Sequence, residues 1–238
     1  MNVGVLASGG GTNLQALLDA QAAGVLGPAR IVVVGVNVPG CGALARAAAA
    51  RVPHFVVDHR SPGEPGGQSG QSGQDGHGGD GPPPGGPREP AAAAAGRREL
   101  FDAALVAALR GHEVELVVLA GFMRILTPVF LSAFAGRVLN IHPSLLPAFP
   151  GVAAQEQALR HGVKLAGCTV HFVEAGGVDS GPIIAQAAVP VLDDDDVASL
   201  RARILVEEHR LLPEVVRAVA EGRVHQSPGD RRLRIRRT

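Results

Sequence analysis

The sequence predicts an α/β fold with a mostly parallel, twisted sheet that carries helices on both faces. In the first half of the chain, short apolar runs alternate with segments of helical spacing, as they do when each strand is followed by a crossover helix. These runs are apolar at nearly every position, which is typical of strands covered on both faces. Two later strand-like runs are separated only by a glycine-rich turn, so we expect antiparallel C-terminal strands. The arrangement is Rossmann-like.

The first part of the chain holds five predicted elements in regular alternation. The apolar runs are short and rich in β-branched residues, and the segments between them carry apolar residues at helical spacing. In chain order we expect a strand at Asn2–Ala7, a helix at Thr12–Ala23, a strand at Ile31–Val36, a helix at Cys41–Arg51 and a strand at His54–Val57.

Residues 61–97 interrupt this pattern. They hold 12 of the 32 glycines, several prolines and almost no large apolar side chain. Because such a segment buries too little apolar surface to offset its ordering entropy, we expect a disordered, Gly/Pro-rich insertion.

The pattern resumes after the insertion and predicts one domain over residues 1–225. Thr127 followed by Pro128 is typical of a helix start, and the acidic run Asp193–Asp196 suits the N-terminus of a long helix. We expect helices at Arg98–Arg110, after Thr127-Pro128, at 153–162, and from the acidic run to about Ala220. We expect strands at Glu115–Ala120, Arg137–Ile141, Val163–Val173 and Ile183–Val191. Residues 226–238 are expected to be a basic tail, frayed from Asp230 onwards.

The composition limits the function classes. Lys+Arg and Asp+Glu are both 22, so the formal net charge is zero, which argues against a nucleic-acid surface. The chain has no apolar stretch of about 18 residues, so we expect no membrane helix. The two cysteines are far apart and the histidines stand in no metal-ligand spacing, so we expect neither a disulfide nor a metal site. A cytoplasmic protein acting on small molecules, as a monomer or homodimer, is the expectation.

A glycine-rich turn, Ser8–Gln15, joins the first predicted strand to the first helix. Consecutive glycines let backbone N–H groups approach an anion, and the helix N-terminus adds its dipole. The turn lacks the lysine of a nucleoside-triphosphate loop, and Leu14 replaces the third glycine of the dinucleotide fingerprint. A monophosphate therefore fits better than NAD or a triphosphate, with a simple tight turn as the alternative.

A second motif, Asn140-Ile141-His142-Pro143, stands at the end of a predicted strand. Asn140 and His142 are two residues apart and so point to the same side. They lie where open α/β sheets bind ligands, at the carboxyl end of a parallel strand. An amide beside an imidazole can stabilise a developing oxyanion, and the histidine can pass a proton.

A third motif, Val178-Asp179-Ser180-Gly181-Pro182, places an aspartate in a turn, where it is most often a turn former. If folding brings Asp179 to His142, its carboxylate would support a protonated imidazole. Sequence spacing alone does not show that contact. His171 alternates with apolar residues in a predicted strand, so we expect a core or wall role for it.

Together these segments resemble the phosphoribosylglycinamide formyltransferases, and they occur in that family's order. The matching segments are Ser8–Gln15, Leu119–Leu126, Asn140–Pro147 with Pro150-Gly151, and Val178–Ile183. The resemblance implies the formyltransferase fold and transfer of a formyl group from 10-formyltetrahydrofolate, a co-substrate, to the amine of glycinamide ribonucleotide in de novo purine biosynthesis. The transfer would be direct, through a tetrahedral intermediate and without a covalent enzyme adduct or a metal.

The resemblance also implies the site residues. The catalytic residues would be Asn140, His142 and Asp179. Gly11, Thr12 and Asn13 would bind the substrate phosphate, and Glu208 the ribose hydroxyls. The folate-binding residues would be Arg98, Phe122, Met123, Arg124, Ile125, Leu126 and Asn140, with Arg98 near the cofactor tail.

Two departures from the family pattern concern the site. Gly151 is followed by Val152-Ala153-Ala154-Gln155 where the family usually has a histidine, and Leu205-Val206-Glu207 lacks a polar substrate partner.

Alternative functions remain open at this stage. A methionyl-tRNA formyltransferase would carry a further C-terminal domain and a basic surface, and a formyltetrahydrofolate hydrolase an extra N-terminal domain. A non-catalytic nucleotide-binding module would keep the glycine loop without the chemistry.

Overall fold

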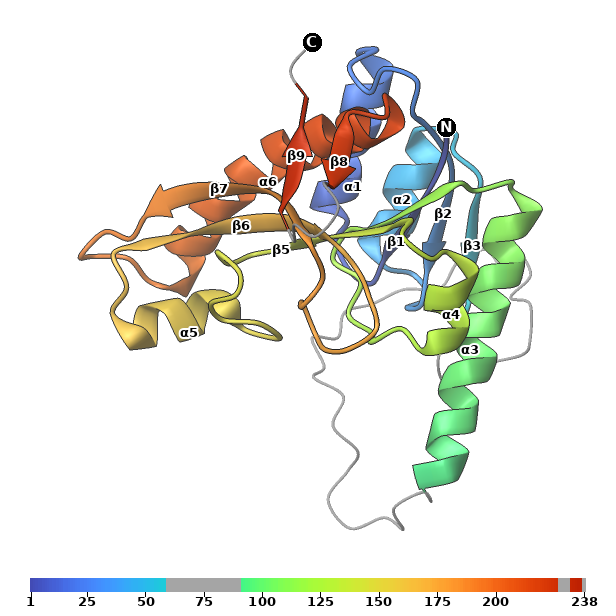
Figure 1. Cartoon of the computed structure of the whole chain (residues 1–238), viewed down its shortest axis with the longest axis horizontal. Coiled ribbons are helices and arrows are strands. Elements are labelled where there is room, and N and C mark those ends of the chain that lie inside the picture. The colour runs from blue at the N-terminus through green and yellow to red at the C-terminus, as the bar shows by residue number, and fades with distance from the viewer. Residues whose placement is uncertain (59–90, 227–231, 237–238) are drawn as a thin grey trace.

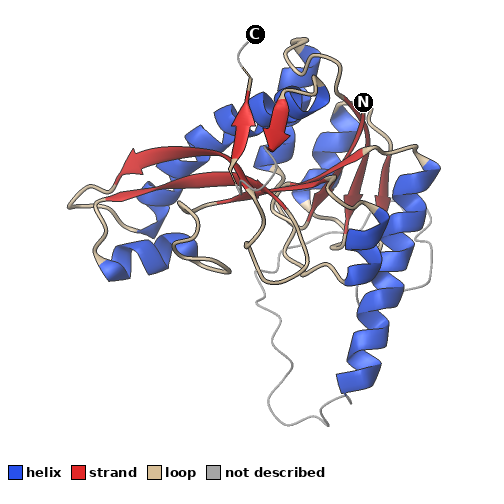
Figure 2. Cartoon of the chain, in the orientation of Figure 1, coloured by secondary structure: helices blue, strands red, loops and turns tan. Residues whose placement is uncertain are grey.

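The computed structural model describes residues 1–58, 91–226 and 232–236, with a seven-stranded sheet at its centre (Figures 1 and 2). The strands are β1 (Asn2–Ala7), β2 (Arg30–Val36), β3 (His54–Val56), β4 (Leu116–Leu119), β5 (Val138–His142), β6 (Leu165–Phe172), β7 (Ile183–Pro190), β8 (Val224–Gln226) and β9 (Leu233–Ile235). The helices are α1 (Thr12–Ala22), α2 (Gly42–Ala49), α3 (Ala91–Gly111), α4 (Pro128–Ala133), α5 (Ala154–His161) and α6 (Val197–Ala220).

The sheet is parallel along one part and antiparallel along the other. Its order is β3-β2-β1-β4-β5-β6-β7, with parallel pairing from β3 to β5 and antiparallel pairing from β5 to β7. This confirms the predicted fold class. Because β1, β4 and β5 are parallel neighbours, their carboxyl ends share one edge, and the loops that follow them lie together there.

Apolar side chains pack into two clusters, one on each face of the sheet. The first cluster joins the strands to α1, α2 and α6, with Leu14 and Leu212 fully buried. The second joins the strands to α3 and α4 and includes Phe130. Neighbouring strand residues alternate between the clusters, as Val117 and Val118 of β4 do, because successive side chains point to opposite faces. The helices therefore cover both faces, as predicted.

The helix expected at Arg98–Arg110 begins earlier than predicted. α3 starts at Ala91, so residues 91–97, predicted as part of a disordered insertion, are helical instead. The physical reason is the run of alanines from Ala91 to Ala95, because alanine has the highest helix propensity. The rest of the predicted insertion, residues 61–90, lies outside the described residues.

The predicted basic tail also contains regular structure. β8 and β9 form an antiparallel pair in which Gln226 lies opposite Leu233, so the expectation of a frayed tail is wrong for residues 233–235. Leu233 and Ile235 alternate with Arg234, as in a strand with one covered face, and both apolar side chains pack against the first cluster.

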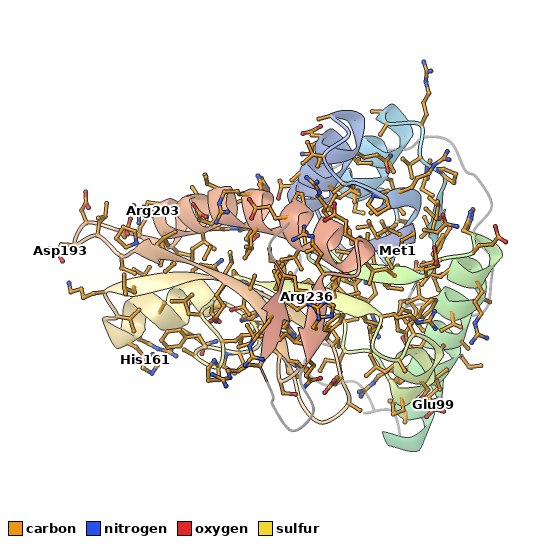
Figure 3. The ribbon with its side chains drawn as sticks, turned by 45° about the horizontal axis from the view of Figure 1, so that its top comes forward. Met1, Glu99, His161, Asp193, Arg203 and Arg236 are labelled. Carbon is orange, nitrogen blue, oxygen red and sulfur yellow. The ribbon has the colours of Figure 1, made fainter. Side chains whose placement is uncertain are left out.

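α6 is the long helix that packs against β6, β7 and α1 (Figure 1). The Asp196 side chain accepts a hydrogen bond from the Ser199 N–H at 2.7 Å, so the acidic run stands at the start of this helix, as predicted, and Asp196 caps it. Arg203, labelled on this helix in Figure 3, donates to Asp195 Oδ2 at 2.6 Å and fixes the first turns. Within the described ranges, no helix is both long enough and apolar enough to cross a bilayer.

Candidate active site

The carboxyl end of β5 presents the expected amide and imidazole side by side. Asn140 and His142 both reach Asp179, which comes from the turn between β6 and β7. The Asn140 Nδ2 donates to Asp179 Oδ1 at 3.3 Å, and the His142 Nδ1 lies 3.2 Å from Asp179 Oδ2. Folding therefore joins three predicted residues, although Asp179 lies 39 positions after Asn140.

The imidazole of His142 is held between two acceptors. Its Nδ1 faces the Asp179 carboxylate, and its Nε2 lies 2.9 Å from the Phe149 carbonyl oxygen. Carboxylate and carbonyl oxygens only accept, so the ring makes both hydrogen bonds when both nitrogens carry a proton. Phe149 has a φ of 52°, a left-handed conformation uncommon outside glycine, at the point where its carbonyl meets the ring.

His171 joins this cluster from the neighbouring strand. It pairs with Asn140 across β5 and β6, and its Nε2 lies 3.1 Å from Asn140 Nδ2 and 3.7 Å from Asp179 Oδ1. Its Nδ1 faces the Phe172 carbonyl oxygen at 2.8 Å, so that nitrogen carries a proton. His171 is buried, as expected of a core or wall residue, yet it also contacts the predicted catalytic residues. The signal that would have identified it is the strand register, which the sequence does not give.

The surroundings of Asp179 favour its ionised form. Burial raises its pKa, but the interactions with His171, the Gly151 amide and His142 outweigh burial and hold the pKa below its usual value. The Gly151 N–H donates to Asp179 Oδ2 at 2.8 Å. The residues directly after Gly151, Val152 to Gln155, include no histidine, whereas His171 stands beside the carboxylate.

The glycine loop meets the long C-terminal helix. Gly11 has a φ of 71°, and a Cβ there would lie 2.9 Å from the Ala43 Cα, so glycine is required. The Asn13 Nδ2 donates to Glu208 Oε2 at 2.7 Å. Burial raises the pKa of Glu208, and the hydrogen bond from Asn13 opposes that rise. The side chain of Asn13, expected at a phosphate, is thus committed to Glu208, while Thr12 is exposed at the start of α1.

Ser8 connects the glycine loop to the loop after β4. Its hydroxyl donates to Asn37 Oδ1 at 2.6 Å and accepts from the Met123 N–H at 2.8 Å. Its own N–H donates to the Gly121 carbonyl oxygen at 3.1 Å. This bridge fixes two predicted binding segments relative to each other. The sequence identifies Ser8 only as the start of the glycine-rich motif. Its hydrogen-bond partners, Asn37 and Met123, are far away in the sequence, so no local pattern indicates them.

The segment Phe122–Leu126, predicted to contact folate, divides between core and surface. Phe122 and Leu126 are buried in the second cluster, whereas Met123 and Ile125 are 75% and 68% exposed. The exposed pair can offer apolar surface to a ligand, while the buried pair anchors the segment.

Two arginines lie beside this segment. The Arg124 guanidinium is 5.0 Å from the centroid of the Phe101 ring. Burial lowers the pKa of Arg124, the nearby Asp102 opposes that shift, and the charge of Arg98 on α3 lowers the pKa further. The charge of Arg98 therefore reaches Arg124, although the carboxylate of Asp102 acts on it more strongly.

Comparison with known proteins shows the family to which the chain is similar. The family model described as formyl transferase matches residues 1–216. A phosphoribosylglycinamide formyltransferase of Mycobacterium tuberculosis is 46% identical over 219 residues, which cover 91% of this chain and 83% of that relative.

Solved structures are similar along the whole chain. The crystal structure of glycinamide ribonucleotide transformylase 1 from Symbiobacterium toebii has a TM-score of 0.79 and 48% identity, covering 99% of this chain and 93% of that one. A formyltetrahydrofolate deformylase from Pseudomonas syringae has a TM-score of 0.76 and 26% identity, covering 98% of this chain and 65% of that one.

Proposed function

The chain belongs to the formyl transferase family, and on that premise we propose that it transfers a formyl group from 10-formyltetrahydrofolate to the amine of glycinamide ribonucleotide. The enzyme class predicted from the sequence is confirmed by similar proteins that carry the name of this activity. The observation that carries the proposal at the site is the contact of Asn140 and His142 with Asp179. An amide, an imidazole and a carboxylate at this spacing supply oxyanion donors and a route for a proton.

The proposed step is a direct transfer. The substrate amine forms a bond to the formyl carbon, and the bond from that carbon to the folate nitrogen breaks. Negative charge develops on the formyl oxygen, where Asn140 Nδ2 and protonated His142 act as hydrogen-bond donors. The His142 Nε2, which faces the Phe149 carbonyl oxygen, exchanges that partner for the formyl oxygen. No side chain attacks the formyl carbon, so no covalent enzyme adduct forms.

Asp179 is proposed to maintain the charge of the histidine. Its pKa is held below the usual value, so the carboxylate stays ionised at neutral pH and stabilises the imidazolium across the 3.2 Å contact. The amine loses one proton and the leaving nitrogen gains one, and the Asp179–His142 pair relays it. The preorganised polar groups lower the barrier because their orientation is fixed before the reaction.

The remaining residues are proposed to position the two substrates. Backbone N–H groups of Gly11 and Thr12 bind the phosphate, and Glu208, held by Asn13, accepts from the ribose hydroxyls.

On the folate side, Met123 and Ile125 contact the pteridine ring, and Arg98 and Arg124 attract its carboxylate tail. The cytoplasmic location and the monomeric or homodimeric state stay predictions.

A coupled assay with glycinamide ribonucleotide and 10-formyltetrahydrofolate tests the function. His142→Ala removes one oxyanion donor and is expected to lower kcat by about 100- to 10,000-fold. His112→Ala, at an exposed position just after α3, is the matched control and is expected to keep full activity. Folate turnover independent of the ribonucleotide would contradict the proposal. If the wild-type chain shows no formyl transfer in this assay, the result would instead indicate a non-catalytic nucleotide-binding module.

A further inference from the structure

The proposed phosphate loop contains no cationic side chain of its own. It runs from Ser8 to Asn13, and Lys164, the one lysine in the sequence, is paired with Asp193 at 2.7 Å. A phosphate monoester carries about −1.5 to −2 charges at neutral pH. If the chain acts on a ribonucleotide, a cation from another element has to meet that charge.

Arg46 of α2 lies directly against this loop. Its Nε donates to the Gly10 carbonyl oxygen at 2.7 Å, and its Nη1 donates to Gln15 Oε1 at 3.0 Å. α2 approaches closely here, since a Cβ on Gly42 would lie 3.1 Å from the Gly10 backbone. The two partners that the guanidinium has among the described residues are uncharged oxygens, so they hold it in place without neutralising its charge.

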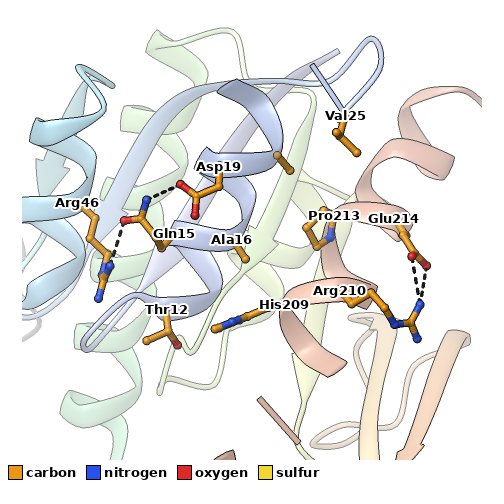
Figure 4. Close-up of a pocket in the computed structure, with 11 residues that line it drawn as sticks. Thr12, Gln15, Ala16, Asp19, Val25, Arg46, His209, Arg210, Pro213 and Glu214 are labelled. Atoms are coloured by element: carbon orange, nitrogen blue, oxygen red, sulfur yellow. Dashed lines mark hydrogen bonds and ion pairs between the residues drawn. The ribbon is translucent and has the colours of Figure 1, made fainter. Parts of the chain in front are cut away.

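The start of α1 has room for an anion beside this arginine. No side chain in the part of the chain that the structure describes caps the start of α1. A cavity of about 500 Å³ adjoins its first residue, and Figure 4 shows Thr12 between Arg46 on one side and His209 on the other.

Two polar atoms near the start of α1 lack partners. Among the described residues, no hydrogen-bond partner is found for the His209 Nε2 or for the Oδ1 of Asn13, a residue only 9% exposed. Buried polar atoms are normally paired, so both atoms are available to a ligand, and of the two residues His209 lines the cavity.

We propose, on the basis of the function proposed above, that Arg46 binds the phosphate of the substrate and makes the enzyme selective for phosphorylated over unphosphorylated ribosides. The contacts to Gly10 and Gln15 occupy Nε and Nη1, which leaves Nη2 for a phosphate oxygen. The helix start contributes N–H donors and its dipole, while Arg46 contributes a full charge. A glycine loop without a lysine thus takes its cation from the adjacent helix.

The test compares two substrates in the intact enzyme. Arg46→Gln is expected to lower kcat/KM for glycinamide ribonucleotide by about 10- to 100-fold, mainly through KM. The kcat/KM for glycinamide ribonucleoside, which has no phosphate, is expected to stay unchanged. Arg46→Lys keeps the charge and is expected to recover part of the loss. An equal loss with both substrates would make Arg46 a structural brace and overturn the proposal, as would no loss with either.

Inorganic phosphate gives a readout that does not depend on turnover. It is expected to raise the melting temperature of the wild type and of the control Arg30→Gln, at an exposed position in β2, but not that of Arg46→Gln. Equal stabilisation of Arg46→Gln would refute its role. If the wild type is active and Arg46→Gln has the same kcat/KM for the ribonucleotide, this inference is refuted but the proposed function stands. If the wild type shows no turnover that depends on the ribonucleotide, the proposed function itself is refuted.

Discussion

At the residue scale, the geometry of the site depends on Asp179. It is the common partner of Asn140, His142 and the Gly151 amide. Its own φ is 54°, a left-handed conformation that aspartate tolerates better than most residues. Both expectations for this residue are therefore met, since it forms a turn and also reaches the histidine. The turn conformation delivers the carboxylate to the end of β5.

Replacing Asp179 with asparagine is expected to lower kcat by about 100- to 10,000-fold, because a neutral amide cannot stabilise protonated His142. Steady-state kinetics in the coupled assay measure the effect. Asp193→Asn is the matched control, since Asp193 is 92% exposed and pairs with Lys164 at the surface. Wild-type kcat in Asp179→Asn would contradict the assigned role.

Glu208→Gln is expected to weaken ribonucleotide binding and to stabilise the fold at neutral pH. Burial raises the pKa of Glu208 in the folded chain above 4.5, so the folded state binds this proton more tightly than the unfolded state. The wild type therefore loses stability as pH rises from about 4.5 through the folded pKa. Glutamine does not titrate, so the melting temperature of the variant is expected to rise relative to the wild type between about pH 4 and pH 7. If the difference in melting temperature between the variant and the wild type is the same at every pH in this range, the titration of Glu208 does not affect stability.

At the element scale, elements were predictable where their signals are local. The apolar run of β5 and the Thr127-Pro128 start of α4 can be identified within a few residues. Contacts between elements could not be predicted in this way. The register that places His171 opposite Asn140 depends on how β6 folds back, and no residue near either position encodes it.

The start of α3 shows a second limit. Its alanines favour helix, but their glycine-rich neighbours led to a prediction of disorder. Gly96→Ala is expected to stabilise the chain by about 0.5–1 kcal/mol, because Gly96 is inside α3 and an added Cβ meets no atom of the described residues within 4 Å. Urea unfolding measures the change.

Gly121→Ala provides the contrast for this prediction. The space around Gly121 is equally open, but its φ is +72°, so alanine is expected to destabilise the chain there. If alanine changes the free energy of unfolding equally at Gly96 and Gly121, the backbone conformation does not decide the outcome and this prediction is wrong.

At the scale of the whole molecule, the two apolar clusters share one sheet, so the chain is expected to unfold as a unit. Leu212→Ala removes a fully buried side chain of α6 and is expected to cost about 2–5 kcal/mol. Val206→Ala on the same helix, 67% exposed, is expected to stay within about 0.5 kcal/mol of the wild type. Circular dichroism and a coincident second probe of urea unfolding measure both. Two separate transitions would show that the clusters unfold independently.

The hydrogen bond from Asn13 to Glu208 joins residues 195 positions apart. During synthesis on the ribosome, the glycine loop emerges at the beginning and its carboxylate partner only near the end. A nascent chain that stops before α6 already contains Asn140, His142 and Asp179, yet it lacks the group proposed to hold the ribose. The onset of formyl transfer in a translation reaction would therefore report that the last long helix has been made and has docked.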